Sequence, residues 1–105
     1  MIRDFFLGFI KIHILYHATE EPIYGLSMIE ELASHGYDLS PGTLYPILHK
    51  LEDQGYLQSE KRVVEGKVRR YYTATPTGED ALAEAYAKAR ELLNEIGGSV
   101  AVEGG

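Results

Sequence analysis

The middle of the chain carries two strand-like segments, residues 56–64 and 67–74, joined by the dipeptide Glu65-Gly66. A two-residue connection of this kind is typical of a tight β-hairpin. The segments on both sides instead space their apolar side chains by three and four residues, which predicts helices. A single hairpin set between helices indicates a mainly α-helical fold with a small β-hairpin.

Three helices are predicted before the hairpin. The first covers residues 2–18, is apolar on almost every side, and ends at Glu20-Glu21-Pro22, because the residue before a proline is pushed out of the α region. The second is about ten residues long and ends at His35-Gly36. Ser40-Pro41 supplies a cap and a first-turn proline for the third, which ends at Gln54-Gly55.

One more helix is predicted after the hairpin. Thr75-Pro76 repeats the cap-and-proline signal, and Gly97-Gly98 is expected to end the helix. Helices followed by a hairpin and a further helix are the order of a winged helix-turn-helix. We therefore expect residues 1–75 to form a winged helix-turn-helix DNA-binding domain, residues 76–97 a C-terminal dimerisation helix, and residues 98–105 a disordered tail.

In a winged helix-turn-helix, the third helix enters the major groove of DNA with its N-terminal end leading. The apolar face of this predicted helix consists of Leu44, Ile47, Leu48 and Leu51. The opposite face then carries a hydroxyl, a phenol and a glycine backbone that can approach phosphate oxygens at the positive end of the helix dipole. The candidate DNA-contacting residues of the helix are Ser40, Pro41, Gly42, Thr43, Tyr45, His49 and Lys50. An alternative is that Ser40, Pro41 and Thr43 serve only to cap the helix.

The predicted hairpin, or wing, concentrates positive charge. Residues 61–70 contain five basic side chains and one acidic side chain, a net charge of +4 in a chain whose net charge is −6. Antiparallel pairing sets Arg62 opposite Arg69, and opposed like charges destabilise a sheet. A hairpin that tolerates this is expected to meet a polyanion, although basic residues also protect exposed edges against strand pairing. The candidate wing contacts are Lys61, Arg62, Lys67, Arg69 and Arg70.

The overall negative charge does not exclude a nucleic-acid partner. DNA binding depends on neutralising phosphates, and residues 40–74 carry six basic against four acidic side chains. The remaining seventy residues therefore hold a net charge of −8. We expect modest, salt-sensitive affinity for non-specific DNA, with the body of the protein repelling the duplex.

Several classes of function are excluded by what the chain lacks. With no cysteine there is no disulfide framework, thiolate zinc site or cysteine nucleophile, and this composition suits a cytoplasmic location. No paired acid and base, nucleophile constellation or phosphate-binding loop indicates an enzyme. The apolar N-terminus is interrupted by charged residues, which argues against a signal peptide or membrane span.

The first and last predicted helices present more apolar surface than one small domain can cover. We expect a homodimer in which this surface is buried between the subunits. The candidate dimerisation residues are Phe5, Phe6, Phe9, Leu82, Ala85, Tyr86, Ala89, Leu92, Leu93 and Ile96. Phe9 and Tyr86 could also line a pocket for a small aromatic effector, although aromatic side chains at helical spacing usually only bury area.

Two histidines suggest a different function. His13 and His17 are four residues apart, and Glu20 and Glu21 follow one turn later, a spacing that could place two imidazoles and a carboxylate on one metal ion. We favour histidines at the edges of a mostly buried helix, and expect no metal and no cofactor. A histidine-based metal sensor remains an alternative, as does a winged-helix protein-interaction module that has lost DNA binding.

Five motifs occur in a specific order along residues 5–96. They are Tyr24-Gly25, the run Ser-Pro-Gly-Thr-Leu-Tyr-Pro-Ile-Leu from Ser40, His-Lys-Leu-Glu from His49, Gly-Tyr-Leu from Gly55, and Gly-Lys-Val-Arg-Arg-Tyr-Tyr from Gly66. This pattern resembles the short subfamily of the PadR-like bacterial transcriptional regulators. The resemblance implies a dimeric winged-helix repressor. With one recognition helix in each subunit, we expect such a dimer to read a roughly palindromic operator. The resemblance also implies that Ser40, Thr43 and Tyr45 contact DNA while Lys67 and Arg69 hold the flanking backbone.

Overall fold

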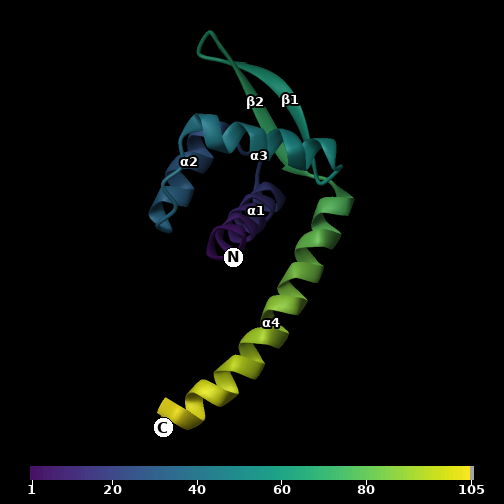
Figure 1. The fold of residues 1–105 in the computed structure, drawn as a ribbon. Helices are drawn as coiled ribbons and strands as arrows, with labels where there is room; N and C mark the ends of the chain where they lie inside the picture. Colours follow the sequence, from purple (N-terminus) through teal and green to yellow (C-terminus); the bar gives the residue numbers. More distant parts are fainter. Residues whose placement is uncertain (105) are drawn as a thin grey trace.

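The computed structural model describes the backbone of residues 1–104 and the side chains of residues 1–98. Its elements are, in order, α1 (Ile2–Glu20), α2 (Gly25–Ser34), α3 (Pro41–Asp53), β1 (Leu57–Val64), β2 (Lys67–Ala74) and α4 (Pro76–Gly104) (Figure 1). The winged helix-turn-helix order predicted from the sequence is confirmed. The first three helices and both strands lie within one or two residues of their predicted bounds.

The hairpin has the predicted register. Its turn residues, Glu65-Gly66, have φ angles of 51° and 76°. A type I′ turn requires positive φ at both central positions, and its twist matches that of the flanking strands. The pairing therefore sets Arg62 opposite Arg69 and Lys61 opposite Arg70.

The core lies where α1, α2, α3 and the base of the hairpin meet. Its buried residues are Ile10, Ile14, Leu15, Ala18, Ile23, Met28, Leu32, Leu44, Leu48, Leu51, Leu57 and Tyr72. The predicted apolar face of α3 is thus buried, with Ile47 packed against it. Because this face is buried, the opposite face of α3 is exposed to solvent.

Backbone hydrogen bonds attach the wing to the helix-turn-helix. Ile23, just before α2, and Tyr72 of β2 exchange hydrogen bonds with N···O distances of 2.9 and 2.7 Å. The Tyr72 side chain is buried, and burial raises the pKa of its phenol. These contacts hold the base of the wing in one position relative to α2.

A close-packed joint connects the wing to α4. Thr75 caps the helix as predicted, because its Oγ1 accepts a hydrogen bond from the Gly78 N–H at 3.0 Å and donates one to the Gly55 carbonyl. Gly78 lies so close to Tyr56 that a Cβ at Gly78 would overlap the Tyr56 carbonyl oxygen. The joint fixes the direction in which α4 leaves the body.

The predicted end of α4 was wrong. The helix passes through Gly97-Gly98 and continues to Gly104. Glycine costs a helix about 1 kcal/mol relative to alanine but ends one only where it adopts a left-handed conformation. Among the described residues, the glycines with positive φ are Gly36, Gly55 and Gly66, so the pair in α4 stays helical. The helix therefore includes residues 98–104, which the sequence had assigned to a disordered tail. Gly105 lies outside the described residues.

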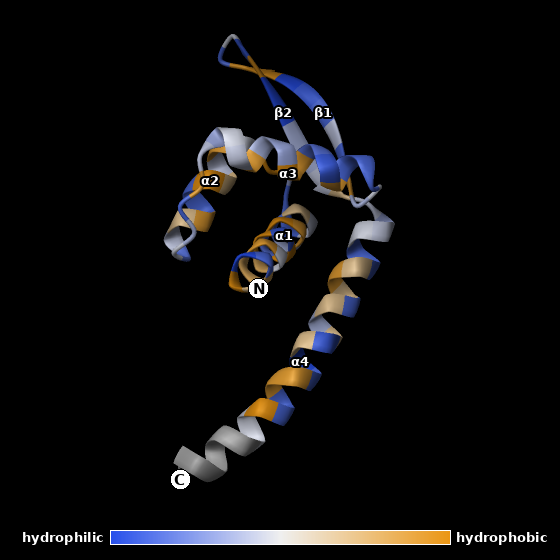
Figure 2. Cartoon of the chain, in the orientation of Figure 1, coloured by the Kyte–Doolittle hydropathy of each residue, from blue (hydrophilic) through white to orange (hydrophobic). Residues whose placement is uncertain are grey.

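Helix α4 projects away from the rest of the chain, on the side opposite the tip of the wing (Figure 1). The longest dimension of the chain is 57 Å. Its Cα radius of gyration is 15.9 Å, whereas the radius of gyration of a compact chain of this length is expected to be about 13 Å. Figure 2 shows apolar residues around most of α1 and at intervals along α4. None of the described helices combines the length and hydropathy needed to cross a bilayer.

Candidate nucleic-acid interface

The outward face of α3 carries every residue that the sequence selected on this helix. All are exposed, namely Ser40, Pro41, Gly42, Thr43, Tyr45, His49 and Lys50. Their exposure follows from the burial of the leucines on the other face. Contact between these residues and DNA stays a prediction.

The first turn of α3 is not capped by a side chain. Ser40 makes no side-chain cap hydrogen bond, and its Oγ lies 3.2 Å from Thr43 Oγ1 instead. The two hydroxyls pair with each other and keep further donor and acceptor capacity. Gly42, between them, leaves the backbone open, because the nearest atom to a Cβ added there would be Ser40 Oγ at 3.8 Å. Ser40 therefore does not cap the helix with its side chain, as the capping-only interpretation of this turn requires.

Tyr45 is held between the two helices of the helix-turn-helix. Its ring and hydroxyl lie against Gly25, the first residue of α2, where a Cβ would overlap them. The side chain is nonetheless 41% exposed. Its phenol is therefore kept in one place at the surface, and the missing side chain at Gly25 permits the close approach of α2 and α3.

The arginines of the wing stack on tyrosine rings. The Arg69 guanidinium lies 4.6 Å from the centre of the Tyr24 ring, and that of Arg62 lies 4.8 Å from the Tyr71 ring. Arg62 also pairs with Glu60. The Tyr71 side chain raises the pKa of Arg69, and an arginine is cationic at neutral pH in any case. Each of the opposed arginines therefore has a favourable contact within the chain, in addition to the polyanion and the edge protection that the sequence suggested.

The other cations of α3 and the wing differ in their hydrogen bonds and ion pairs. Arg70 Nη1 donates a hydrogen bond to Ser59 Oγ at 2.9 Å, and Ser59 donates one to Glu52 Oε2 of α3 at 2.6 Å. The Arg70 charge is therefore linked through a serine to an acidic group. Within the side chains of residues 1–98, the other cations of α3 and the wing that form no ion pair are Lys50, Lys61, Lys67 and Arg69.

A groove of about 310 Å³ joins the two halves of this surface. It is lined by Tyr24, Gly25, Leu26, Tyr45, Val68, Arg69 and Arg70. Tyr45 of α3 is thus brought together with two cations of the wing. Tyr24 and Leu26 were absent from the predicted contacts, although the Tyr24-Gly25 motif marked this place. Tyr24 and Leu26 line the groove because the start of α2 packs against the wing. No local sequence pattern reveals this packing.

A second groove, of about 610 Å³, lies between α1 and α4. Seven of the ten candidate dimerisation residues line it: Phe5, Phe9, Leu82, Ala85, Tyr86, Ala89 and Leu92. Leu93 and Ile96 are exposed farther along α4, whereas Phe6 packs toward Tyr37 with ring centroids 6.1 Å apart. His13 also lines this groove, and its pKa is lowered by burial and by the neighbouring His35 and His17. Phe9 and Tyr86, which the sequence suggested as the lining of an effector pocket, therefore both line this groove.

Known proteins are similar to this chain in sequence and fold. The sequence profile of the family described as the transcriptional regulator PadR-like family matches residues 14–84. The transcriptional regulator Rv3488 of Mycobacterium tuberculosis is 47% identical over 95 residues, which cover 90% of this chain and 89% of that protein. A PadR family transcriptional regulator from Eggerthella lenta superposes with a TM-score of 0.80 at 33% identity, covering 95% of this chain and 88% of that one. A PadR-like transcription factor from Bacteroides fragilis gives a TM-score of 0.79 at 29% identity, covering 90% and 92%.

Proposed function

Because the chain belongs to the PadR-like family of transcriptional regulators, we propose that it binds double-stranded DNA as a homodimer and represses transcription from a palindromic operator. One observation carries the proposal: the groove that joins Tyr45 of α3 to Arg69 and Arg70 of the wing. A helix to insert and cations to hold the phosphates beside it are the two parts that a winged helix-turn-helix needs.

The two parts have different tasks in this proposal. The first turn of α3 enters the major groove, where Ser40, Thr43 and Tyr45 set the position along the duplex and read base edges. The unpaired cations Lys67 and Arg69 hold the adjacent phosphates and supply affinity that does not depend on sequence. Glu52 and Asp53 lie at the far end of α3, where repulsion from the duplex matters less.

A second copy of this chain is the occupant that we propose for the groove between α1 and α4. Leu93 and Ile96 follow the groove residues Ala89 and Leu92 by four residues each, which is the spacing of neighbours on one helix face, and both are exposed. A helix that extends this far from its own domain needs a partner to cover its apolar face. Two-fold symmetry then places the two α3 helices about one helical turn of DNA apart. A small aromatic effector that binds beside Phe9 and Tyr86 would change this spacing through α1 and α4.

Arg69→Gln is expected to weaken binding to all DNA sequences alike. Loss of one phosphate contact should reduce the slope of log affinity against log salt by about one. The measurement is fluorescence anisotropy with operator and non-operator DNA at several salt concentrations. Arg90→Gln removes an exposed arginine of α4 and serves as the matched control, with an unchanged slope. If Arg69→Gln also leaves the slope unchanged, Arg69 does not contact DNA.

Thr43→Val is expected to weaken operator binding by about 0.5–1.5 kcal/mol through the loss of one hydroxyl hydrogen bond. The melting temperature should hardly change, because Thr43 is exposed and valine and threonine have similar helix propensities. Thr77→Val makes the same change in the first turn of α4 and should alter neither quantity. A large fall in melting temperature with unchanged operator affinity would instead assign Thr43 to helix capping.

A further inference from the structure

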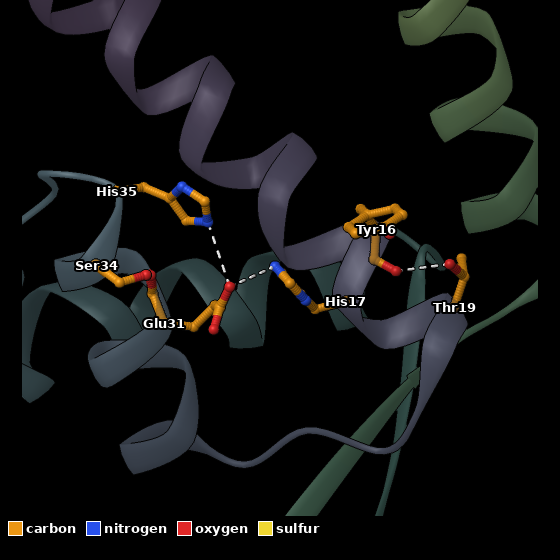
Figure 3. Close-up of polar contacts among 6 residues, drawn as sticks. All are labelled: Tyr16, His17, Thr19, Glu31, Ser34 and His35. Atoms are coloured by element: carbon orange, nitrogen blue, oxygen red, sulfur yellow. Dashed lines mark hydrogen bonds and ion pairs between the residues drawn. The ribbon is translucent and has the colours of Figure 1, made fainter.

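Three of the chain's four histidines meet at the contact between α1 and α2. His13 and His17 come from α1, and His35 follows the last residue of α2. Each offers a ring nitrogen, and these nitrogens all lie within 4.8 Å of one another. Figure 3 shows His17 and His35 both directed at the carboxylate of Glu31, although they come from different elements.

The carboxylate of Glu31 lies beside two of the three histidines. Its Oε1 lies 3.3 Å from His17 Nε2 and 3.2 Å from His35 Nε2. Ligand bonds of about 2.0–2.1 Å arranged tetrahedrally around zinc separate neighbouring ligand atoms by roughly 3.3–3.4 Å. The two separations are close to a tetrahedral edge, and the one to His35 is also a hydrogen bond. The ring of His13 stacks on that of His35 with centroids 4.7 Å apart, and its ligand nitrogen lies within 4.8 Å of those of His17 and His35.

We propose that His13, His17, His35 and Glu31 form a binding site for one divalent transition-metal ion such as zinc. Three imidazoles and one carboxylate are a donor set that zinc, cobalt and nickel accept. The three histidine nitrogens must approach one another by up to about 1.4 Å to reach tetrahedral edges, and Glu31 and His13 must also turn toward the same ion. All four side chains are partly or fully exposed, so an ion can enter from solvent.

This site differs from the one that the sequence spacing suggested. Among the described side chains, Glu20 and Glu21, one turn after His17, form no ion pair with these histidines, whereas Glu31 pairs with two of them. The additional ligands come instead from α2, at Glu31, and from His35, which directly follows it. A bound ion would link α1, which carries one wall of the apolar groove, to α2 of the helix-turn-helix. The proposal concerns metal binding by the free protein and holds whether or not the chain binds DNA.

The test is titration of the metal-free protein with cobalt(II) and zinc(II), without DNA. Calorimetry is expected to give one ion per chain, and cobalt is expected to show the intense visible absorption of tetrahedral sites, which zinc then displaces. Saturating zinc should also raise the melting temperature, because the ion binds only the folded arrangement. Absence of stoichiometric binding would overturn the proposal.

Variants distinguish this site from other histidines and carboxylates. His35→Ala and Glu31→Gln should each lower zinc affinity by at least about tenfold, and Glu31→Gln preserves the shape of the side chain. His49→Ala removes the fourth histidine, on the exposed face of α3, and should leave zinc affinity unchanged. If the double variant Glu20→Gln/Glu21→Gln lowers zinc affinity while Glu31→Gln and His35→Ala do not, the ion binds along α1 alone and the proposed site is wrong.

Discussion

Replacing Leu92 by aspartate is expected to convert the proposed dimer into monomers and to weaken operator binding by about 10²–10⁴-fold. Leu92 lines the groove between α1 and α4 and is 52% exposed in the single chain. A carboxylate buried without a partner at an interface is strongly unfavourable, whereas the separate chain leaves it hydrated. A monomer holds one half-site only, so it loses the gain from binding the second half-site intramolecularly.

Light scattering at micromolar concentration measures the change directly. The mass should fall from about twice 11.7 kDa to 11.7 kDa, while circular dichroism shows that the monomer stays folded. Leu92→Met is the matched control, because it keeps the volume and the apolar character of the side chain and should remain a dimer. A wild-type protein that is monomeric, or a Leu92→Asp protein that stays dimeric, would contradict the proposed interface.

Gly78→Ala is expected to lower the free energy of unfolding by about 1–3 kcal/mol, the usual cost of forcing extra atoms into a packed site. The added Cβ would overlap the carbonyl oxygen of Tyr56, which also accepts a hydrogen bond from the Thr75 N–H at 3.1 Å. The added Cβ is fixed to the backbone and meets backbone atoms of Tyr56. No flexible side chain is therefore available to move aside. For a small domain, each kcal/mol corresponds to a fall of about 4–8 °C in melting temperature.

The same substitution at Gly97 supplies the control. Gly97 lies in α4 as Gly78 does, but a Cβ there would meet nothing within 4 Å. Alanine favours a helix over glycine by about 1 kcal/mol, so Gly97→Ala should raise stability slightly. Chemical denaturation of both variants gives the comparison. Equal stability changes at the two positions would mean that the joint between the wing and α4 is not close-packed.

Features set by local sequence could be predicted. The Glu65-Gly66 dipeptide determined the two-residue turn, and the turn determined which residues of the two strands face each other. The apolar spacing of α3 determined which of its side chains are buried and therefore which are exposed. Thr75-Pro76 marked the start of α4, because capping depends on residues within one turn.

Features that depend on contacts between distant segments could not be predicted. Nothing local connects Tyr24 with Arg69, so the sequence left the opposed arginines of the wing without an internal explanation. His35 and Glu31 reach His17 only through the packing of α2 on α1. The helix end expected at Gly97-Gly98 was wrong for another reason, since glycine permits a left-handed turn without requiring one.

Sequencing of genomic DNA fragments retained by the purified protein at low and high salt tests the proposed DNA recognition most directly. If two α3 helices read an operator, the fragments that survive high salt will share an inverted repeat whose half-sites are centred about 10 bp, or a small multiple of one helical turn, apart. Fragments retained only at low salt will share no sequence. Retention of no fragments, or of fragments without a common inverted repeat at high salt, would contradict operator binding by a homodimer.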